Sequence, residues 1–278
     1  MRLVVTGSSG FLGRALVVEA SSRQWEVVAV SRRALTPPPG VEFHQVADYM
    51  DTPPGDCIVH LAEASDMFSP RDQISEVMDQ ESLIESLVQK SLRGVVYASS
   101  SAVYGRSATV PFVESAPILG NNDYVINKIK NEKTTLDCGG IVLRFSNIFG
   151  PRMSESNVIS DIFKQMSSSG PVVLKSLSPI RDFLWVEDAV KAVCDIVEIE
   201  DRGIFNVGSG IGTSIGTLAK KCLTFAGQER REVLGVLDDR EQNCNVVSVR
   251  KLSKYCCWKP LIGLDEGLQL LLRKFNTD

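Results

Sequence analysis

Leu3-Val4-Val5-Thr6-Gly7-Ser8-Ser9-Gly10-Phe11-Leu12-Gly13 is the stretch that decides the fold of this chain. Its first four residues form an apolar run typical of a buried strand, and a helical pattern follows from Arg14 to about Ser21. A glycine-rich turn between a strand and a helix lets the backbone approach a pyrophosphate, because free N–H groups and the helix dipole favour the anion. The GxxGxxG spacing therefore predicts a dinucleotide-binding turn; a tight turn without a ligand is the alternative.

The next strand bears on which dinucleotide is bound. Glu26-Val27-Val28-Ala29-Val30 reads as this strand, and it ends at Ser31-Arg32-Arg33. In such folds an acidic residue at this point binds the ribose 2′-hydroxyl of NAD, whereas an arginine accommodates the 2′-phosphate of NADP. Ser31 stands where the acid would be, so we expect NADP(H) rather than NAD(H). The alternative is that Arg32 and Arg33 are solvated loop charges.

Strand-like and helix-like segments alternate along the following residues. Strands are expected at 41–46, 57–62, 94–99 and 141–145, and helices at 73–90 and from 124 to about 136. Such alternation implies βαβ units and a parallel sheet with helices on both faces. We expect an α/β fold, with a Rossmann-type doubly wound parallel sheet and a smaller C-terminal α/β substrate lobe.

Composition and charge exclude several classes of protein. The 278 residues carry a formal net charge of -4, whereas nucleic-acid binders usually present a basic face. Seven cysteines, an odd number without CxxC spacing, favour reduced thiols and no metal site. No apolar run approaches the roughly 18 residues of a membrane span, and the N-terminus lacks a signal-peptide layout. We therefore expect a cytoplasmic protein that binds neither nucleic acid nor a membrane.

Tyr124-Val125-Ile126-Asn127-Lys128 is a candidate catalytic motif. On a helix this spacing places the tyrosine and the lysine on one face, one turn apart. A lysine ammonium beside a phenol favours the phenolate and lowers a pKa that starts at about 10. A tyrosine tuned in this way can pass a proton to or from a substrate oxygen near neutral pH. The spacing is common by chance, so its weight depends on the motifs around it.

Seven motifs occur in series along most of the chain. They are GSSGFLG at 7–13, HLAE at 60–63, SSSAVYG at 99–105, YVINK at 124–128, LRFSNIFGPR at 143–152, RDFLWVEDA at 181–189 and FNVGSG at 205–210. In this order they resemble the extended short-chain dehydrogenase/reductase family, in its nucleotide-sugar epimerase/dehydratase/reductase branch.

The resemblance implies a set of cofactor-binding residues. The glycines would line the pyrophosphate, Asp48 would approach the adenine, and Leu61 and Ala62 would contact the nicotinamide half. Together with the strand-end residues considered above, the expected set is Gly7, Ser9, Gly10, Phe11, Leu12, Gly13, Ser31, Arg32, Arg33, Asp48, Leu61, Ala62, Tyr124 and Lys128.

The resemblance also implies catalytic and substrate-binding residues. Tyr124 would be the acid/base, and Lys128 would hold the nicotinamide ribose and depress the Tyr124 pKa. The hydroxyl of Ser100, or of its neighbour Ser101, would hydrogen-bond the reacting sugar oxygen. The expected substrate-binding residues are Ser100, Ser101, Asn147, Asn157, Arg181 and Arg240. The guanidinium fork of an arginine suits a diphosphate; for Arg240, a surface charge among acidic neighbours is the alternative.

Two lobes are implied, and neither is contiguous in sequence. Residues 1–150 would bind the cofactor, with 182–210 returning to that lobe, and 151–180 and 211–278 would form the substrate lobe. Members of the family often dimerise through paired helices, so a homodimer through 73–90 and 124–136 is an option.

Two departures from the family pattern bear on the substrate pocket. Glu63 replaces the last alanine of the usual HLAA, which places a carboxylate near the site. Glu76 stands where the family tends to have an asparagine that braces the active site. Both could reshape the pocket, and they weaken the transfer of any specific substrate.

Three functions remain open. Dehydratases of the family carry an acidic residue just after the catalytic Ser/Thr, and Ser101-Ala102 has none, so we discount dehydration. One reading is NADPH-dependent reduction of a 4-keto sugar on a nucleotide diphosphate, and another is a 4-epimerase that retains NAD. The expected NADP preference favours the reductase. A non-catalytic NADP-sensing protein on the same fold is the third reading.

Overall fold

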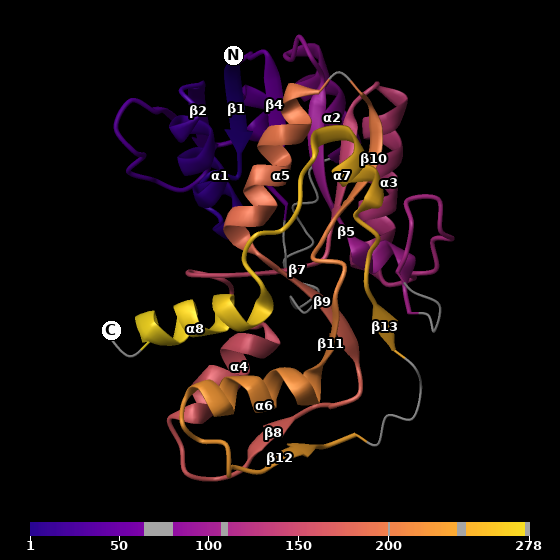
Figure 1. The fold of residues 1–278 in the computed structure, drawn as a ribbon. Helices are drawn as coiled ribbons and strands as arrows, with labels where there is room; N and C mark the ends of the chain where they lie inside the picture. Colours follow the sequence, from indigo (N-terminus) through magenta and orange to yellow (C-terminus); the bar gives the residue numbers. More distant parts are fainter. Residues whose placement is uncertain (64–79, 107–110, 200, 238–242, 276–278) are drawn as a thin grey trace. The chain divides into compact units, whose positions relative to one another are not determined.

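The computed structural model describes residues 1–63, 80–106, 111–199, 201–237 and 243–275. Within these the chain divides into two compact units (Figure 1). The first comprises Met1–Val103, Gly120–Arg144 and Val190–Phe205, and the second comprises Tyr104–Leu119, Phe145–Ala189 and Asn206–Asp278. That one unit binds cofactor and the other substrate stays a prediction. No described helix is long and apolar enough to cross a membrane.

A seven-stranded sheet forms the centre of the first unit, in the order β10-β6-β5-β4-β1-β2-β3. The strands are β1 (Arg2–Thr6), β2 (Glu26–Ser31), β3 (Glu42–Gln45), β4 (Cys57–His60), β5 (Val95–Ser100), β6 (Ile141–Phe145) and β10 (Gly203–Val207). Strand β1 runs parallel to both β2 and β4, with Val4 opposite Val28 and Ile58. The strand order therefore reverses beside β1, and in parallel sheets ligands bind at the carboxyl ends of the strands at such a point.

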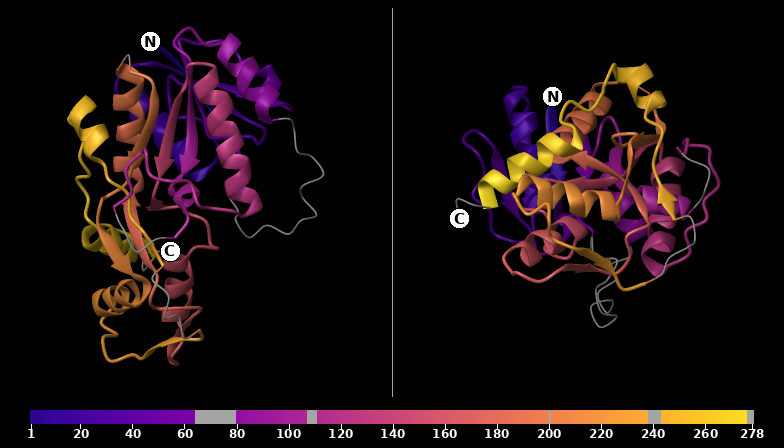
Figure 2. Two further views of the ribbon diagram at one scale, coloured as in Figure 1. Left: turned by 90° about the vertical axis from the view of Figure 1, so that its right-hand side faces the viewer. Right: turned by 60° about the horizontal axis from the view of Figure 1, so that its bottom comes forward.

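Helices cover both faces of this sheet (Figure 2). They are α1 (Phe11–Ser22), α2 (Gln80–Gln89), α3 (Asp123–Asp137) and α5 (Val186–Glu198). Helix α2 packs against α3, and α3 against β5. Helices α1 and α5 meet through Arg23, whose guanidinium lies 2.7 Å from the carboxylate of Asp195. The predicted doubly wound Rossmann-type sheet is confirmed.

The second unit is built around β9 (Ile180–Trp185). This strand pairs in parallel with β7 (Asn147–Phe149) and β13 (Cys244–Asn245), and antiparallel with β11 (Gly212–Ser214). A separate parallel pair joins β8 (Val172–Leu174) to β12 (Val233–Gly235). The helices are α4 (Val158–Met166), α6 (Ile215–Phe225), α7 (Arg250–Cys256) and α8 (Leu264–Phe275). Most of these strands are too short to give a sequence period, which is why the sequence did not predict them.

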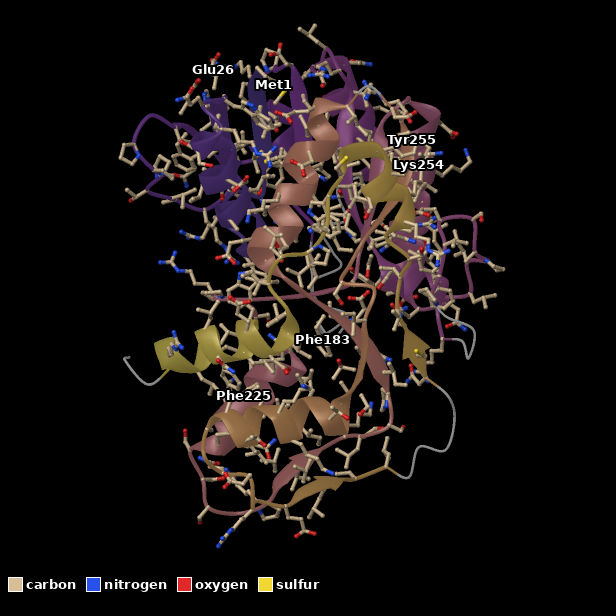
Figure 3. The ribbon with its side chains drawn as sticks, viewed as in Figure 1. Met1, Glu26, Phe183, Phe225, Lys254 and Tyr255 are labelled. Carbon is tan, nitrogen blue, oxygen red and sulfur yellow. The ribbon has the colours of Figure 1, made fainter. Side chains whose placement is uncertain are left out.

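The core of the second unit is apolar and rich in aromatic rings. Phe149 meets Phe183 and Trp185 edge to face, at ring-centre distances of 6.4 and 5.3 Å. Phe183 comes from β9, and Phe225, at the end of α6, packs against the same core (Figure 3). Helix α8 approaches this cluster closely, because a Cβ on Gly267 would lie 2.6 Å from the Phe149 ring.

A buried ion pair holds α3 against the sheet of the first unit. Glu132 on α3 accepts hydrogen bonds from Arg144 on β6, from Nε at 2.9 Å and from Nη2 at 2.6 Å. The hydroxyl of Ser99 on β5 donates to the same carboxylate. The two charged side chains are only 3% and 2% exposed. This contact fixes the helix that carries Tyr124 and Lys128.

We expect Glu132→Ala to lower the free energy of unfolding by about 3–5 kcal/mol, because it leaves the Arg144 guanidinium buried and unpaired. Urea denaturation of the two proteins measures the difference. The control is Asp137→Ala on the same helix, which removes an exposed partner of Lys133 and should leave the midpoint unchanged. Equal effects of the two substitutions would contradict this account of α3.

Candidate active site

The turn after β1 has no room for a side chain at Gly7 or Gly13. Gly7 adopts φ +71°, and a Cβ there would lie 2.8 Å from the carbonyl carbon and oxygen of Leu61. A Cβ on Gly13 would collide with the Gly7 carbonyl oxygen. Gly10 donates its N–H to that oxygen at 2.9 Å and caps α1 in an extended conformation. At its glycines the turn therefore presents a cradle of bare backbone.

Helix α1 begins at this cradle with an N-terminus that is free of negative charge. No side chain caps its N-terminus, and its first turn contains no acidic residue. Its first two residues, Phe11 and Leu12, present backbone N–H groups at the positive end of the helix dipole. The cradle and the helix end together fit the pyrophosphate of a dinucleotide.

The end of β2 is fixed to the cradle by Ser31. This buried hydroxyl donates to the hydroxyl of Ser9 at 2.6 Å and accepts the N–H of Arg33 at 3.0 Å. The Arg32 guanidinium lies 5.6 Å from the centre of the Tyr49 ring. Both arginines are exposed, and neither pairs with a carboxylate within the described ranges. Their guanidinium groups are thus exposed just after the strand end that Ser31 joins to the glycine turn.

The other expected cofactor residues also lie at the carboxyl ends of the strands. The Asp48 carboxylate follows β3 and accepts the N–H of Met50 at 2.7 Å. Leu61 follows β4 and donates its N–H to the Thr6 carbonyl at 3.3 Å, and Ala62 comes next. Apart from Tyr124 and Lys128 on α3, the structure therefore brings the predicted cofactor residues to the carboxyl ends of β1 to β4, as the fold class requires. Their contacts with a cofactor stay predictions.

Tyr124 and Lys128 share one face of α3, as their spacing predicts. The Lys128 ammonium lies 5.8 Å from the centre of the Tyr124 ring and 4.8 Å from that of Tyr97. It donates to the carbonyl of Ala98 at 2.7 Å and to the carboxylate of Glu63. The Lys128 side chain is only 9% exposed, so it reaches its partners from within the unit.

Glu63 is held by three donors. One oxygen, Oε1, accepts the Tyr97 hydroxyl at 2.7 Å and the Asn131 amide at 2.6 Å, and the other accepts the Lys128 ammonium. Burial alone would raise the pKa of Glu63, but the Lys128 charge and hydrogen bonds outweigh it, so the pKa is lowered. Burial, and then the Glu63 charge, raise the pKa of Tyr97 well above its ordinary value.

Two members of this cluster were missed in the sequence. Asn131 follows Lys128 by three residues, which places it on the same helix face. This spacing could have predicted that Asn131 belongs to the cluster. Tyr97 lies in a strand of mainly apolar residues, where no sequence signal indicated that its hydroxyl would take part in a hydrogen-bond cluster. The cluster is therefore a product of β4, β5 and α3 meeting, and Glu63 is the departure from the family pattern that connects them.

The two candidate hydroxyls differ in exposure. Ser100 ends β5, is half-buried, and accepts the N–H of Ala102 at 3.1 Å. Ser101 begins the short 3-10 helix 101–104 and is buried, at 4% exposure. The more accessible hydroxyl is therefore that of Ser100, and its catalytic role stays a prediction.

The expected substrate residues of the second unit have structural partners. Asn147 donates to the Asp182 carbonyl at 3.1 Å, and Asn157 caps α4 by accepting two N–H groups at 2.9 and 3.0 Å. The Arg181 guanidinium donates to both oxygens of Asn243, each at 2.9 Å, and to the Ile180 carbonyl. Asn147 and Arg181 lie on paired strands, whereas Asn157 lies apart from them at a helix end. Arg240 and Glu76 lie outside the described residues.

A buried histidine lies behind the cluster. His60 ends β4, and its Nδ1 is 2.8 Å from the Thr6 hydroxyl. Its ring stacks on that of Tyr97, with the centres 6.3 Å apart. Burial penalises the imidazolium and lowers the pKa of His60, which outweighs the opposing effect of the nearby Glu63 charge. His60 is therefore neutral in the folded protein near neutral pH.

Comparison with known proteins gives the family. The model of the NAD dependent epimerase/dehydratase family matches residues 3–208. The chain belongs to this family. Its similar proteins include enzymes that act on nucleotide sugars. The match confirms the family resemblance, and it confirms the prediction that this protein is an enzyme that uses a nicotinamide cofactor.

Three similar proteins cover nearly the whole chain. It is 26% identical over 314 residues to the dTDP-4-dehydro-6-deoxyglucose reductase of Escherichia coli, covering 99% of this chain and 97% of that protein. It is 26% identical over 301 residues to the GDP-6-deoxy-D-mannose reductase of Pseudomonas aeruginosa, with the same coverage of 99% and 97%. The UDP-glucose 4-epimerase of Thermus thermophilus, solved with NAD, matches with a TM-score of 0.85 and 25% identity over 99% of each chain.

The lowered pKa of His60 predicts a pH-dependent stability. The unfolded chain takes up a proton near the ordinary histidine value of about 6.5, and the folded chain does so only at lower pH. The free energy of unfolding should therefore fall below about pH 6.5, by up to about 1.4 kcal/mol per pH unit. Urea denaturation between about pH 7.5 and 5 measures this slope.

Two matched variants isolate the histidine responsible. His60→Gln should abolish the slope, whatever its effect on the absolute stability. His44→Gln, which removes the half-buried histidine of β3 and the only other one in the chain, should retain it. A slope that survives in His60→Gln would show that another group is responsible.

Proposed function

We propose that this protein catalyses the NADPH-dependent reduction of a 4-keto sugar carried on a nucleotide diphosphate. The observation that carries the proposal is the end of β2, where Ser31 is hydrogen-bonded to Ser9 of the glycine turn and the exposed arginines Arg32 and Arg33 follow directly. A ribose 2′-phosphate requires positive charge at this place, whereas the 2′-hydroxyl of NAD requires an acceptor. A reductase exchanges its cofactor in every cycle, and NADP(H) suits this use.

The segments at the carboxyl ends of the strands would each hold one part of the cofactor. The backbone of the glycine turn and the start of α1 would bind the pyrophosphate, Arg32 and Arg33 the 2′-phosphate, and Asp48 the adenine. The nicotinamide half would lie against the residues that follow β4 and beside α3. The residues proposed for this half are Leu61, Ala62, Tyr124 and Lys128.

The chemistry assigned to the side chains is a proton transfer. When bound, NADPH supplies the hydride that adds to the carbonyl carbon of the sugar. Tyr124 donates its phenol proton to the carbonyl oxygen, which becomes the hydroxyl of the product, and solvent returns a proton to Tyr124. Ser100 donates a hydrogen bond to the same oxygen and thereby orients the carbonyl. The Lys128 ammonium stabilises the phenolate left by the transfer.

The substrate class is supported by the relatives rather than by the site alone. Two proteins named as reductases of nucleotide-linked deoxy sugars match this chain over nearly its whole length. On the protein side, Asn147, Asn157, Arg181, Arg240 and Ser101 are the proposed substrate contacts. For Arg181 to bind a diphosphate, its guanidinium must exchange its bonds with Asn243 for bonds with the phosphates.

A 4-epimerase that retains NAD is the second candidate. The match to the Thermus thermophilus UDP-glucose 4-epimerase favours it, because the whole fold is shared at 25% identity. In that case Tyr124 would first accept the proton of a sugar hydroxyl and later return it. The two candidates differ in whether the hydride stays with the product.

Net NADPH consumption distinguishes the two candidates. Purified protein should carry no retained NAD and should oxidise NADPH when 4-keto sugar nucleotides are added. Tyr124→Phe should lower the rate by about 10²–10⁴-fold because the proton donor is lost, while NADPH binding is spared. Redox-neutral conversion of a nucleotide sugar by protein with tightly held NAD would overturn the reductase. Full activity of Tyr124→Phe would refute the assigned proton transfer.

Cofactor dissociation constants test the assignment of the arginines. Arg32→Ala and Arg33→Ala should each weaken NADPH binding by about 10–100-fold, the loss of one charge-assisted hydrogen bond, with little effect on NADH. Arg230→Ala, an exposed arginine of the second unit, is the control and should change neither constant. Tighter binding of NADH than of NADPH by the wild type would contradict the NADP assignment.

A further inference from the structure

Among the residues that the structure describes, Glu63 is the one carboxylate that contacts the Lys128 ammonium. Its side chain is 15% exposed, and both of its oxygens accept hydrogen bonds from neighbouring elements. Asn131 also donates to the Tyr97 hydroxyl, at 3.3 Å. Glu63, Tyr97 and Asn131 are therefore each hydrogen-bonded to the other two. The carboxylate is therefore fixed in place rather than free to leave the lysine.

Lys128 is anchored at two of its three N–H groups. One goes to Glu63 and one to the Ala98 carbonyl, at 2.7 Å. These bonds hold the ammonium 5.8 Å from the centre of the Tyr124 ring. An ammonium has three donors, so one remains for a ribose or a water. The contacts decide both where the charge lies and how much of it the phenol experiences.

We propose that Glu63 is a positioning residue that holds Lys128 beside Tyr124 and cancels part of its charge there, so that Tyr124 works as a proton donor to a substrate carbonyl. An isolated ammonium strongly favours a phenolate, which is a base. An ammonium paired with a carboxylate presents a dipole, whose field at the phenol is weaker. A phenol that keeps its proton suits reduction, in which the phenol O–H bond breaks and the O–H bond of the product forms.

The other titratable groups around this pair do not replace Glu63. From β4, His60 faces the pair and is kept neutral by burial, which lowers its pKa. From β5, Tyr97 stays protonated, because burial and Glu63 raise its pKa. From α3 come Tyr124 and Lys128 themselves. Glu63 therefore provides the negative charge in this set of described residues, and the inference rests on the proposed reductase for its direction.

Tyrosinate absorbance tests this without substrate or cofactor. The chain has five tyrosines, and subtracting the titration of Tyr124→Phe isolates the ionisation of Tyr124. In Glu63→Gln, measured with and without Tyr124→Phe, Tyr124 should ionise about one pH unit lower than in the wild type, an environmental shift of ordinary size. Glu63→Asp, which keeps the charge, should shift it by less than half of that. Glu85→Gln, an exposed glutamate of α2, should leave it unchanged.

The pH profile of NADPH-dependent reduction gives the second readout. In Glu63→Gln, activity should fall on the alkaline side about one pH unit lower than in the wild type. Glu63→Asp should restore the pH profile of the wild type. An unshifted ionisation of Tyr124 in folded Glu63→Gln, or an equal shift in Glu63→Asp, would overturn the role of Glu63. If Glu63→Gln does not fold, the wild-type titration decides: ionisation of Tyr124 near neutral pH overturns the proposal, and ionisation well above it supports the proposal.

The two proposals can fail separately. If the protein proves to be an epimerase, the absorbance titration still reports whether Glu63 governs Tyr124, because it involves no turnover. If NADPH is consumed but the titration does not move, the reductase stands and the role of Glu63 is refuted.

Discussion

The close approach of Gly7 to the residues that follow β4 is the constraint on which the rest of the first unit depends. A Cβ at Gly7 would lie 2.8 Å from the Leu61 carbonyl and 2.9 Å from the Ala62 nitrogen, so the two chain segments touch through backbone alone. This contact brings the start of α1 and the end of β4 to one edge of the sheet. The glycine turn, which we propose binds the pyrophosphate, and the segment that carries Glu63 are neighbours because of it.

Two buried ion pairs act on α3 for different purposes. Glu132 and Arg144 lie almost entirely within the unit and connect the helix to β5 and β6, so they fix its position. Glu63 and Lys128 lie at the carboxyl ends of the strands, and Lys128 is 5.8 Å from the centre of the Tyr124 ring, where we propose that their pairing reduces the positive charge near the phenol. Burying an ion pair costs desolvation and is weak evidence of stabilisation. A second pair of this kind beside the proposed proton donor is thus better explained by chemistry than by stability.

Much of the first unit was predictable because its signals are local. The expected strand at 41–46 is found as β3 at Glu42–Gln45, and the expected helix from 124 to about 136 as α3 at Asp123–Asp137. The strand expected at 57–62 ends earlier, at His60, because Leu61 and Ala62 turn out of the sheet beside Gly7. The second unit was less predictable, since strands of two or three residues such as β13 and β11 show no period.

The sequence by itself determined the class of fold, the glycine turn, and the sharing of one helix face by Tyr124 and Lys128. Each of these depends on residues close together in the chain, where backbone geometry alone relates spacing to position. Only the tertiary structure decided that Glu63 pairs with a lysine 65 residues away, and that Tyr97 and Asn131 hold it there. Such contacts depend on strand order and helix packing, which no local pattern encodes. The charge around the phenol is therefore a property of the fold.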